Sequence, residues 1–385
     1  MARLGDVCEI LNGYAFKSAN YTDKGVRIIR ISNVQKGYIE DNTPAFYPFD
    51  DINVAKYELF EGDLLLSLTG NVGRVGRLDK KFLPAALNQR VACIRIKDNT
   101  ALDKSFLFDL LNSDSFEQKC ILSSKGVAQK NLSTEWLKDY KIPLPPLDEQ
   151  REIAAVLDKV SDLIAKRRQQ LNKLDELVKS RFIEMFGVYP ANPMGWEIGT
   201  IRDIVTEIRY GSSRPAVDGG KYPYLRMNNI TYGGELDLSD TKRIDIPDNE
   251  LDKCTVRRGD ILFNRTNSKE LVGKTCVYDR DEMMVLAGFV IRIRVKDRIL
   301  PEFLSAFLNT DFSKQMLLGM CKTAIGQANI NAQELQNIGL YLPPVELQRR
   351  FVQFKKETDK SKLAIQKSLE KLEILKKALM QKYFG

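Results

Sequence analysis

The chain carries the same long segment twice. Residues 144–187, "LPPLDEQREIAAVLDKVSDLIAKRRQQLNKLDELVKSRFIEMFG", and residues 342–385, "LPPVELQRRFVQFKKETDKSKLAIQKSLEKLEILKKALMQKYFG", are each 44 residues long and begin with Leu-Pro-Pro. Both end with Phe-Gly, and 198 residues separate them. A repeat at this distance indicates two similar halves, and it constrains the architecture more strongly than any other feature of the sequence.

Four shorter matches extend the repeat beyond these segments. In chain order they are "IIRISNVQKGYIE" with "YLRMNNITYGGEL", "GDLLLSLTGNVGRVGRL" with "GDILFNRTNSKELVGKT", "VACIRIKD" with "VIRIRVKD", and "GVAQKNLS" with "AIGQANIN". Their offsets lie between 196 and 199 residues. We therefore predict four segments: a globular module at 1–143, a long helix at 144–187, a second module at 188–341 and a second long helix at 342–385.

The modules have the pattern of mixed α+β domains. Alternating apolar residues in "RIIRISNV" and "VIRIRVKD" predict short strands, and Gly and Asn pairs between such stretches predict turns. By contrast, "SFLFDLLNSDSFEQKC" and "PEFLSAFLNTDFSKQM" have helical spacing. The expected fold class is thus α+β, with two modules joined by two long helices in a pseudo-two-fold internal repeat.

Both long segments have the seven-residue apolar spacing of a coiled coil. One row of the first segment consists of Leu157, Ile164, Leu171, Val178 and Met185. The chain order requires antiparallel pairing, with the modules at opposite ends. The predicted contacts join Leu157, Ile164, Leu171 and Val178 to Ile365, Leu369, Leu372 and Leu379. A helix of this length spans about 60 Å, or roughly 17 base pairs of duplex DNA.

Composition excludes several kinds of site. The chain has no histidine, so zinc centres and histidine-dependent catalysis are not expected. Its six cysteines lie far apart, which favours a reduced, cytoplasmic protein without disulfides. No apolar run is long enough to span a membrane, and no phosphate-binding or nuclease motif is present. We predict no catalytic residue, no metal and no cofactor bound by this chain.

A net charge of +8 is compatible with nucleic acid without requiring it. Side chains that bind base edges and phosphates are concentrated in turn-rich stretches of both halves. The candidate DNA-binding residues are Tyr14, Lys17, Arg30, Ser32, Asn33, Thr69, Asn71, Arg74, Lys125, Gln129, Lys130, Asn131, Arg209, Tyr210, Ser212, Ser213, Arg214, Arg226, Asn228, Asn229, Asn264, Arg265, Asn267, Lys269, Lys322, Gln327 and Asn329. Taken one at a time, each of these residues is more simply explained as part of a solvated turn than as a DNA contact.

On the paired Leu-Pro-Pro segments, together with "GVAQKNLS", "AIGQANIN", "GDLLLS" and "GDILFN", the chain resembles the specificity subunit of type I restriction-modification systems. The resemblance covers the whole chain. It implies a non-catalytic subunit that binds double-stranded DNA, with each module recognising one half of a bipartite asymmetric site. It also implies two adenine methyltransferase subunits that bind S-adenosylmethionine, and restriction subunits that use ATP and Mg²⁺.

Two alternatives remain open at the level of sequence. One is a coiled-coil adaptor that separates two protein-binding modules without touching DNA. The other is a fused enzyme that modifies DNA by itself. The second long helix also has a basic stretch, which consists of Lys355, Lys356, Lys360 and Lys362. We expect this stretch to be a solvated helix face and not a DNA contact, because charge runs on helices usually face solvent.

Overall fold

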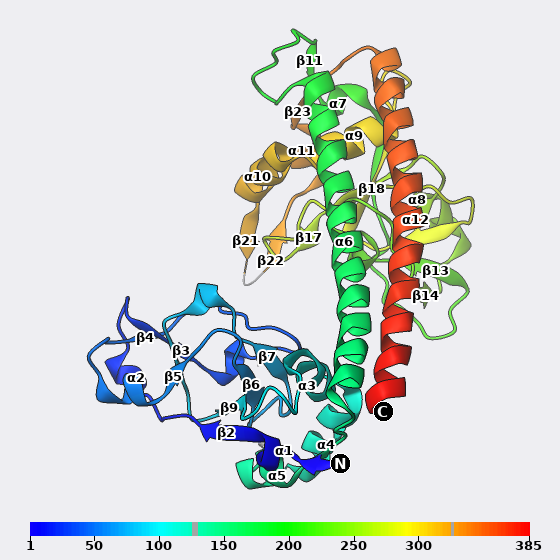
Figure 1. The fold of residues 1–385 in the computed structure, drawn as a ribbon. Helices are drawn as coiled ribbons and strands as arrows, with labels where there is room; N and C mark the ends of the chain where they lie inside the picture. Colours follow the sequence, from blue (N-terminus) through cyan, green and yellow to red (C-terminus); the bar gives the residue numbers. More distant parts are fainter. Residues whose placement is uncertain (125–129, 325–326) are drawn as a thin grey trace. The chain divides into compact units, whose positions relative to one another are not determined.

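The computed structural model describes residues 1–124, 130–324 and 327–385, and in these described residues no helix is long and apolar enough to cross a membrane. The chain divides into two compact units (Figure 1): residues 1–167 with 367–385, and residues 168–366. Each unit contains one module and part of each long helix. This division differs from the four expected segments because the modules pack against the helices instead of standing apart from them.

The module of the first unit contains two four-stranded sheets. The first has the order β2-β9-β6-β7, with β2 (Cys8–Asn12), β9 (Val91–Ile96), β6 (Leu64–Ser67) and β7 (Val75–Arg77). The second has the order β4-β3-β8-β5, with β4 (Phe46–Tyr47), β3 (Val26–Ile29), β8 (Ala85–Leu87) and β5 (Glu58–Leu59). Strands β3 and β8 are parallel, and the other neighbours in these sheets are antiparallel.

Short helices and an edge pair complete this module. Its helices are α1 (Leu4–Val7), α2 (Ile52–Lys56), α3 (Lys104–Leu111), α4 (Asp114–Ser123) and α5 (Thr134–Asp139). Strand β1 (Ala2–Arg3) pairs with β10 (Lys141–Ile142), so the first residues of the module lie beside its last. One apolar core contains residues of β6, α3 and α4, and another contains residues of β3, β6 and β8.

The second unit repeats this topology strand by strand. Its two sheets have the orders β12-β20-β16-β18 and β14-β13-β19-β15, and β13 and β19 are the parallel pair. The strands are β12 (Val205–Tyr210), β20 (Val290–Val295), β16 (Ile261–Asn264), β18 (Thr275–Val277), β14 (Lys242–Ile244), β13 (Tyr222–Leu225), β19 (Met284–Leu286) and β15 (Thr255–Val256). The identical strand order confirms the internal repeat.

The remaining elements of the second unit also follow the repeat. Its helices are α7 (Ile201–Ile204), α8 (Asp248–Cys254), α9 (Pro301–Leu308), α10 (Asp311–Met320) and α11 (Ala332–Gln336), and β11 (Ile198–Thr200) pairs with β23 (Gly339–Tyr341). A small third sheet joins β17 (Thr266–Asn267), β22 (Gln327–Asn329) and β21 (Lys322–Ala324). At the matching place of the first unit, Thr69 and Asn131 form a single antiparallel bridge.

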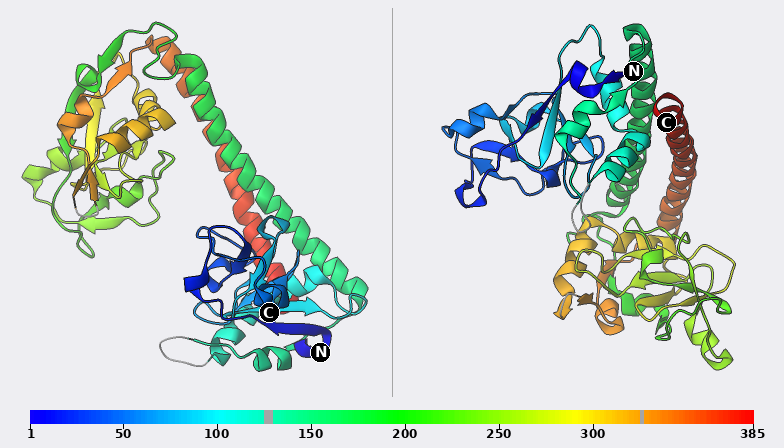
Figure 2. Two further views of the ribbon diagram at one scale, coloured as in Figure 1. Left: turned by 90° about the vertical axis from the view of Figure 1, so that its left-hand side faces the viewer. Right: turned by 90° about the horizontal axis from the view of Figure 1, so that it is seen from below.

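The long helices are α6 (Leu147–Phe186) and α12 (Val345–Phe384). Each begins directly after the two prolines, which cannot continue a helix backwards, and ends before the glycine. In the first unit Leu157, from the first half of α6, shares a core with Leu379 and Phe384 at the end of α12. In the second unit Phe182, near the end of α6, packs on Phe351 near the start of α12. The packing is therefore antiparallel within each unit, and Figure 2 shows the two helices side by side.

Burial along α6 follows the predicted seven-residue spacing. Leu157 and Ile164 are buried, while Leu171, Val178 and Met185 are half-buried. Of the predicted contacts between the helices, Leu157 and Leu379 belong to one core. On α12, Ile365, Leu369 and Leu372 are half-buried, and their pairing with the α6 row stays a prediction.

A buried glutamine follows the Leu-Pro-Pro motif in both halves. Gln150 is fully buried in the first turn of α6. Its side chain accepts a hydrogen bond from the Asp103 amide (2.9 Å) and donates to the carbonyls of Ala101 (3.0 Å) and Pro145 (2.8 Å). Gln348 of α12 makes the equivalent three bonds in the second unit. This glutamine attaches the start of each long helix to the segment that precedes α3 or α9.

Candidate DNA interface

In each unit the carboxyl ends of the two parallel strands lie at one side of the module, which we call the parallel-strand edge. Parallel strands end at the same side of a sheet, so the segments that follow them lie close together. In the first unit, residues 30–32 follow β3 and residues 88–90 follow β8, so the two segments are neighbours. In the second unit, residues 226–228 and 287–289 follow β13 and β19 in the same way.

A third segment joins each edge through a parallel bridge. Tyr14, after β2, bridges to Asn88, and Ser212, after β12, bridges to Ala287. The glycines before them, Gly13 and Gly211, allow this close approach, because an added Cβ would lie 2.2 Å from the Asn88 carbonyl oxygen or 2.1 Å from that of Leu286. The sequence therefore places the same set of segments at the same edge of both units.

In the second unit this edge surrounds a cavity of about 540 Å³. Six predicted DNA-binding residues line it: Ser212, Ser213, Arg214, Arg226, Asn228 and Arg265. They come from three stretches that are far apart in sequence, and the fold brings them together around one cavity. Three guanidinium groups and three small polar side chains are the donors and acceptors that suit phosphates and base edges.

Protein contacts hold the arginines of this cavity in place. Arg214 donates to Glu250 (2.7 Å), and this hydrogen bond lowers the pKa of Glu250, so the pair is ionised at neutral pH. Arg226 pairs with Asp240 at 2.8 Å. Arg265 donates to Asn329 (3.0 Å) and lies over the Tyr210 ring at 4.8 Å. Among the described residues, the Nε atoms of Arg226 and Arg265 are buried and have no hydrogen-bond partner.

The edge of the first unit has a different set of side chains. Tyr14 is half-buried and stacks on Tyr57, whereas Lys17 and Ser32 are exposed. The Arg30 guanidinium donates to the Thr43 carbonyl and hydroxyl. The fold thus repeats the scaffold of the edge but changes its chemistry.

Other predicted residues lie on the neighbouring turns. Arg74 donates to Gln35 (2.8 Å) and Thr69 donates to Asn131 (2.7 Å), while Asn71 and Lys130 are exposed. In the second unit Arg209 is exposed and forms an ion pair with Glu207 (2.5 Å), and Lys269 is also exposed. The Tyr210 hydroxyl accepts a hydrogen bond from the Ala332 amide, and the Asn267 side chain accepts one from the Ser268 amide. Lys125 and Gln129 lie outside the described residues, as do the side chains of Lys322 and Gln327.

Three of the predicted residues are buried within the protein, which argues against direct DNA contact by their side chains. Asn33 and Asn229 are each 2% exposed and Asn264 is fully buried. Asn33 accepts from the Arg30 amide and donates to the Glu40 carbonyl, and Asn229 makes the matching bonds in the second unit. These amides close a turn after the parallel strand, so they cannot reach a base. Thr69 and Ser212 are also buried, at 7% and 5% exposure, and contribute to the scaffold of the edge.

The candidate residues predicted from sequence do not include residues 89–90 and 288–289, the pair that we call the tip of each edge. Gln89 and Arg90 are exposed between β8 and β9, and Phe289, at the matching position before β20, is 53% exposed. A signal was present, since "LNQRVACIRIKD" and "LAGFVIRIRVKD" align through the strand repeat and differ at these positions.

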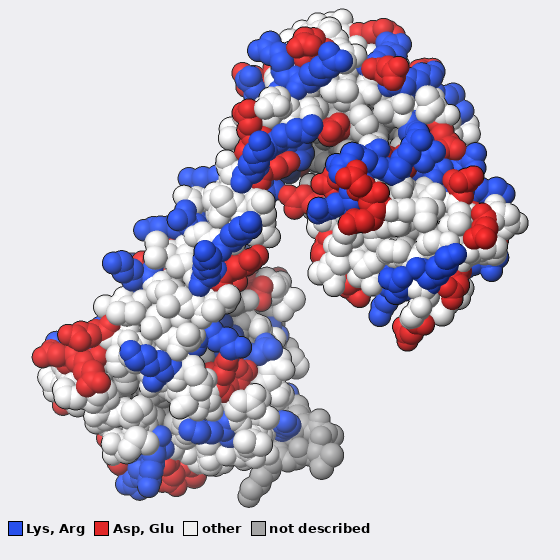
Figure 3. Space-filling view, turned by 90° about the vertical axis from the view of Figure 1, so that its right-hand side faces the viewer, with Lys and Arg blue, Asp and Glu red and all other residues white. Residues whose placement is uncertain are grey.

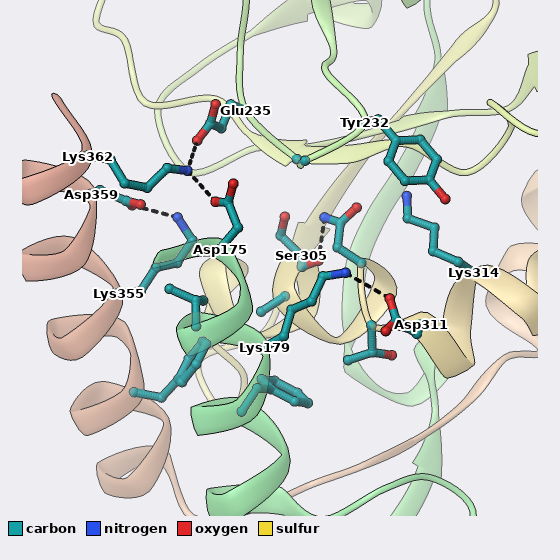
Figure 4. Close-up of a pocket in the computed structure, with 18 residues that line it drawn as sticks. Asp175, Lys179, Tyr232, Glu235, Ser305, Asp311, Lys314, Lys355, Asp359 and Lys362 are labelled. Carbon is teal, nitrogen blue, oxygen red and sulfur yellow. Dashed lines mark hydrogen bonds and ion pairs between the residues drawn. The ribbon is translucent and has the colours of Figure 1, made fainter. Parts of the chain in front are cut away.

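A second cavity in the second unit is lined by several ion pairs (Figure 4). It has a volume of about 370 Å³ and lies against α6, α10 and α12. Lys362 pairs with Asp175 (2.7 Å) and Glu235 (2.5 Å), and Lys355 pairs with Asp359 (2.6 Å). Burial lowers the pKa of Lys314 in this cavity to about 8. Lys355 and Lys362 of the basic stretch are thus paired with carboxylates of the protein, while the expectation that the stretch is not a DNA contact stays a prediction.

Charge and reactive groups complete the description of the surface. On the face that Figure 3 shows, basic and acidic side chains alternate over both units. The described residues contain no group of three or more Cys, Asp or Glu side chains placed to hold a metal ion. Burial raises the pKa of the Cys8, Cys120 and Cys276 thiols to about 12, so these cysteines are protonated at neutral pH.

Comparison with known proteins gives the family. The model of the family described as "Type I restriction modification DNA specificity domain" matches residues 1–176 and 193–376. The chain is 22% identical to the EcoKI specificity subunit of Escherichia coli K12 over 100% of this chain and 88% of that protein. Its identity to the Escherichia coli EcoBI specificity subunit is 25%, over 99% and 84% of the two chains.

Solved structures agree on the fold. A chain from a structural study of the assembly and conformational transition of a type I system superimposes with a TM-score of 0.60 at 20% identity, covering 100% of this chain and 96% of that one. The specificity subunit from M. genitalium gives a TM-score of 0.54 at 15% identity, covering 100% and 95%. Because the family model matches nearly the whole chain in two copies, the chain belongs to the family of type I restriction-modification DNA specificity subunits.

Proposed function

We propose that this chain binds double-stranded DNA through the parallel-strand edge of each module and that each edge recognises one half of a bipartite asymmetric site. One observation carries the proposal. Both units place the same backbone segments at this edge, but the side chains that those segments present differ. Equal scaffolds with unequal polar groups suit two readers of different short sequences.

As a member of a specificity-subunit family, the chain contributes recognition and not catalysis. We propose that it assembles with two methyltransferase subunits, which bind S-adenosylmethionine, and with restriction subunits that use ATP and Mg²⁺, in the cytoplasm. The long helices offer surface for such partners. Leu177 of α6 and Leu363, Ile374 and Leu375 of α12 are 47%, 55%, 70% and 46% exposed, and exposed apolar side chains of this kind favour protein contacts.

Methylome sequencing tests the proposed recognition. A host that lacks type I systems would express the chain with its methyltransferase subunit, and we expect adenine methylation at one bipartite motif. The chain expressed alone should produce no methylation, because it supplies no catalytic group. Methylation by this chain alone would support the fused-enzyme alternative, and a complex without an enriched motif would support the adaptor.

A module exchange tests independent reading. Replacing residues 1–143 by the matching module of another family member should change one half of the motif and leave the other half unchanged. Changes in both halves would contradict independent recognition by the modules.

A helix insertion tests whether α6 and α12 set the distance between the half-sites. One additional heptad in each helix preserves the buried row and adds about 10 Å, which corresponds to roughly three base pairs. The expected result is a longer spacer between unchanged half-sites. An intact complex with the original spacer would contradict this role for the helices.

A further inference from the structure

The residue pair at the tip of each edge is placed by the same backbone bonds in both units. In the first unit the Gln89 amide donates to the Tyr14 carbonyl (2.9 Å), and the Leu68 amide donates to the Arg90 carbonyl (3.0 Å). In the second unit the Gly288 amide donates to Ser212 (2.7 Å), and the Arg265 amide donates to Phe289 (3.0 Å). Arg90 and Phe289 therefore hold the same position on two copies of one scaffold.

The side chains at this position are exposed, whereas the arginines near them are held by protein groups. Arg30 and Arg74 of the first unit bind protein groups, but among the described residues the Arg90 side chain makes no hydrogen bond or ion pair. In the second unit all three arginines of the cavity have protein partners, and the apolar ring of Phe289 is exposed at the cavity, as are the polar side chains of Ser213 and Asn228.

Resting on the proposed function, we propose that Arg90 and Phe289 are specificity-determining residues of opposite chemistry. Arg90 donates to O6 and N7 of a guanine in the major groove of its half-site, which is the contact that arginine makes best. Phe289 cannot form such bonds, and it packs on the 5-methyl group of a thymine in the other half-site, the apolar feature of that groove. One half-site is thus read by a charged donor and the other by an apolar contact at matched positions.

The first experiment compares methylomes of Arg90→Ala and Phe289→Ala with that of the unaltered chain. Arg90→Ala should relax one guanine position in one half-site, and Phe289→Ala should relax one thymine position in the other. Lys24→Ala and Met283→Ala are matched controls. Both residues are exposed and precede β3 and β19, at the opposite ends of the parallel strands from the tips, so the motif should not change.

The second experiment measures binding of the purified complex with methyltransferase subunits to duplexes that carry the motif. Replacing the guanine by 7-deazaguanine should weaken binding by the unaltered complex roughly 5- to 150-fold and leave the Arg90→Ala complex unaffected. Replacing the thymine by deoxyuridine removes its methyl group, which should cost about 4-fold in affinity only when Phe289 is present.

The outcomes separate this proposal from the proposed function. If the unaltered complex gives no bipartite motif, the proposed function fails. If the motif is present but Arg90→Ala and Phe289→Ala leave it unchanged, DNA recognition stands and the assignment of these two residues is overturned. Equal sensitivity of unaltered and variant complexes to the modified bases would also overturn it.

Discussion

Replacing Gln150 by alanine should destabilise the first unit by about 3 kcal/mol. The side chain is fully buried and makes three hydrogen bonds of 2.8–3.0 Å with backbone groups. A typical bond of this kind contributes about 0.5–1.5 kcal/mol to the free energy of unfolding. Alanine makes none of them and leaves the Asp103 amide and two carbonyls to find new partners. Gln150→Glu should be no better, because a carboxylate cannot donate to the two carbonyls.

The two tryptophans allow each unit to be followed separately. Trp136 belongs to the first unit and Trp196 to the second. In a Trp196→Phe background, urea unfolding followed by Trp136 fluorescence should show a midpoint lower by about 1 M for Gln150→Ala. In a Trp136→Phe background, Gln348→Ala should lower the midpoint that Trp196 reports.

Gln118→Ala is the matched control, since Gln118 is exposed on α4 of the same unit. Its free energy of unfolding should change by less than about 0.5 kcal/mol. The reasoning would be refuted if Gln150→Ala unfolded at the same urea concentration as Gln118→Ala. It would also be refuted if Trp136 and Trp196 reported equal losses, because the bonds lie within one unit.

Three further substitutions test separate features of the fold. Burial raises the pKa of Asp109 from its ordinary value of 3.8 to about 7. Between these two pH values the folded state keeps a proton on Asp109 that the unfolded state loses. The free energy of unfolding therefore falls as the pH rises from 3.8 to about 7. Asp109→Asn should therefore raise the free energy of unfolding by about 2–4 kcal/mol at pH 8 but little at pH 4, as measured by urea unfolding with Trp136. Gly13→Ala should cost about 1–3 kcal/mol, because its Cβ would lie 2.2 Å from the Asn88 carbonyl oxygen; an unchanged thermal midpoint would contradict the close approach. Gly319 lies in α10, and a Cβ added there would have no other atom within 4 Å. Gly319→Ala should therefore stabilise the second unit by about 0.5–1 kcal/mol in the same assay, because alanine favours the helix more than glycine does.

The helices could be predicted closely because their signals are local. Two prolines and a glycine delimit each of them, and the apolar spacing of seven fixes the buried face of α6. The sheets could be predicted only as a strand-rich class. The parallel pairing of β3 with β8 joins segments separated by more than 50 residues, and β4 and β5 are only two residues long. No periodicity identifies such pairs, so the edge that gathers the candidate DNA-binding segments could not be located from sequence.

Residue type identified polar loops but could not show which of their side chains are buried. Asn33 and Arg30 in "RISN" have the composition of a base-reading loop, and so do Asn229 and Arg226 in "RMNN". The structure uses both asparagines to close a turn, because a short amide can satisfy backbone groups two or three residues away. Burial, which a polar loop sequence does not reveal, decided these cases.

The repeat itself provides a way to make this distinction. Polar residues that are identical in both halves hold the scaffold: Asp63 pairs with Arg95 (2.6 Å) just as Asp260 pairs with Arg294 (2.7 Å), and the two buried glutamines make matching bonds. Residues that differ at matched positions include the open tips of the edges. A duplicated chain must keep its fold in both copies but needs two different ligand surfaces. Identity between its halves therefore marks residues that hold the fold, and under the proposed function a difference at an exposed matched position marks a candidate for specificity.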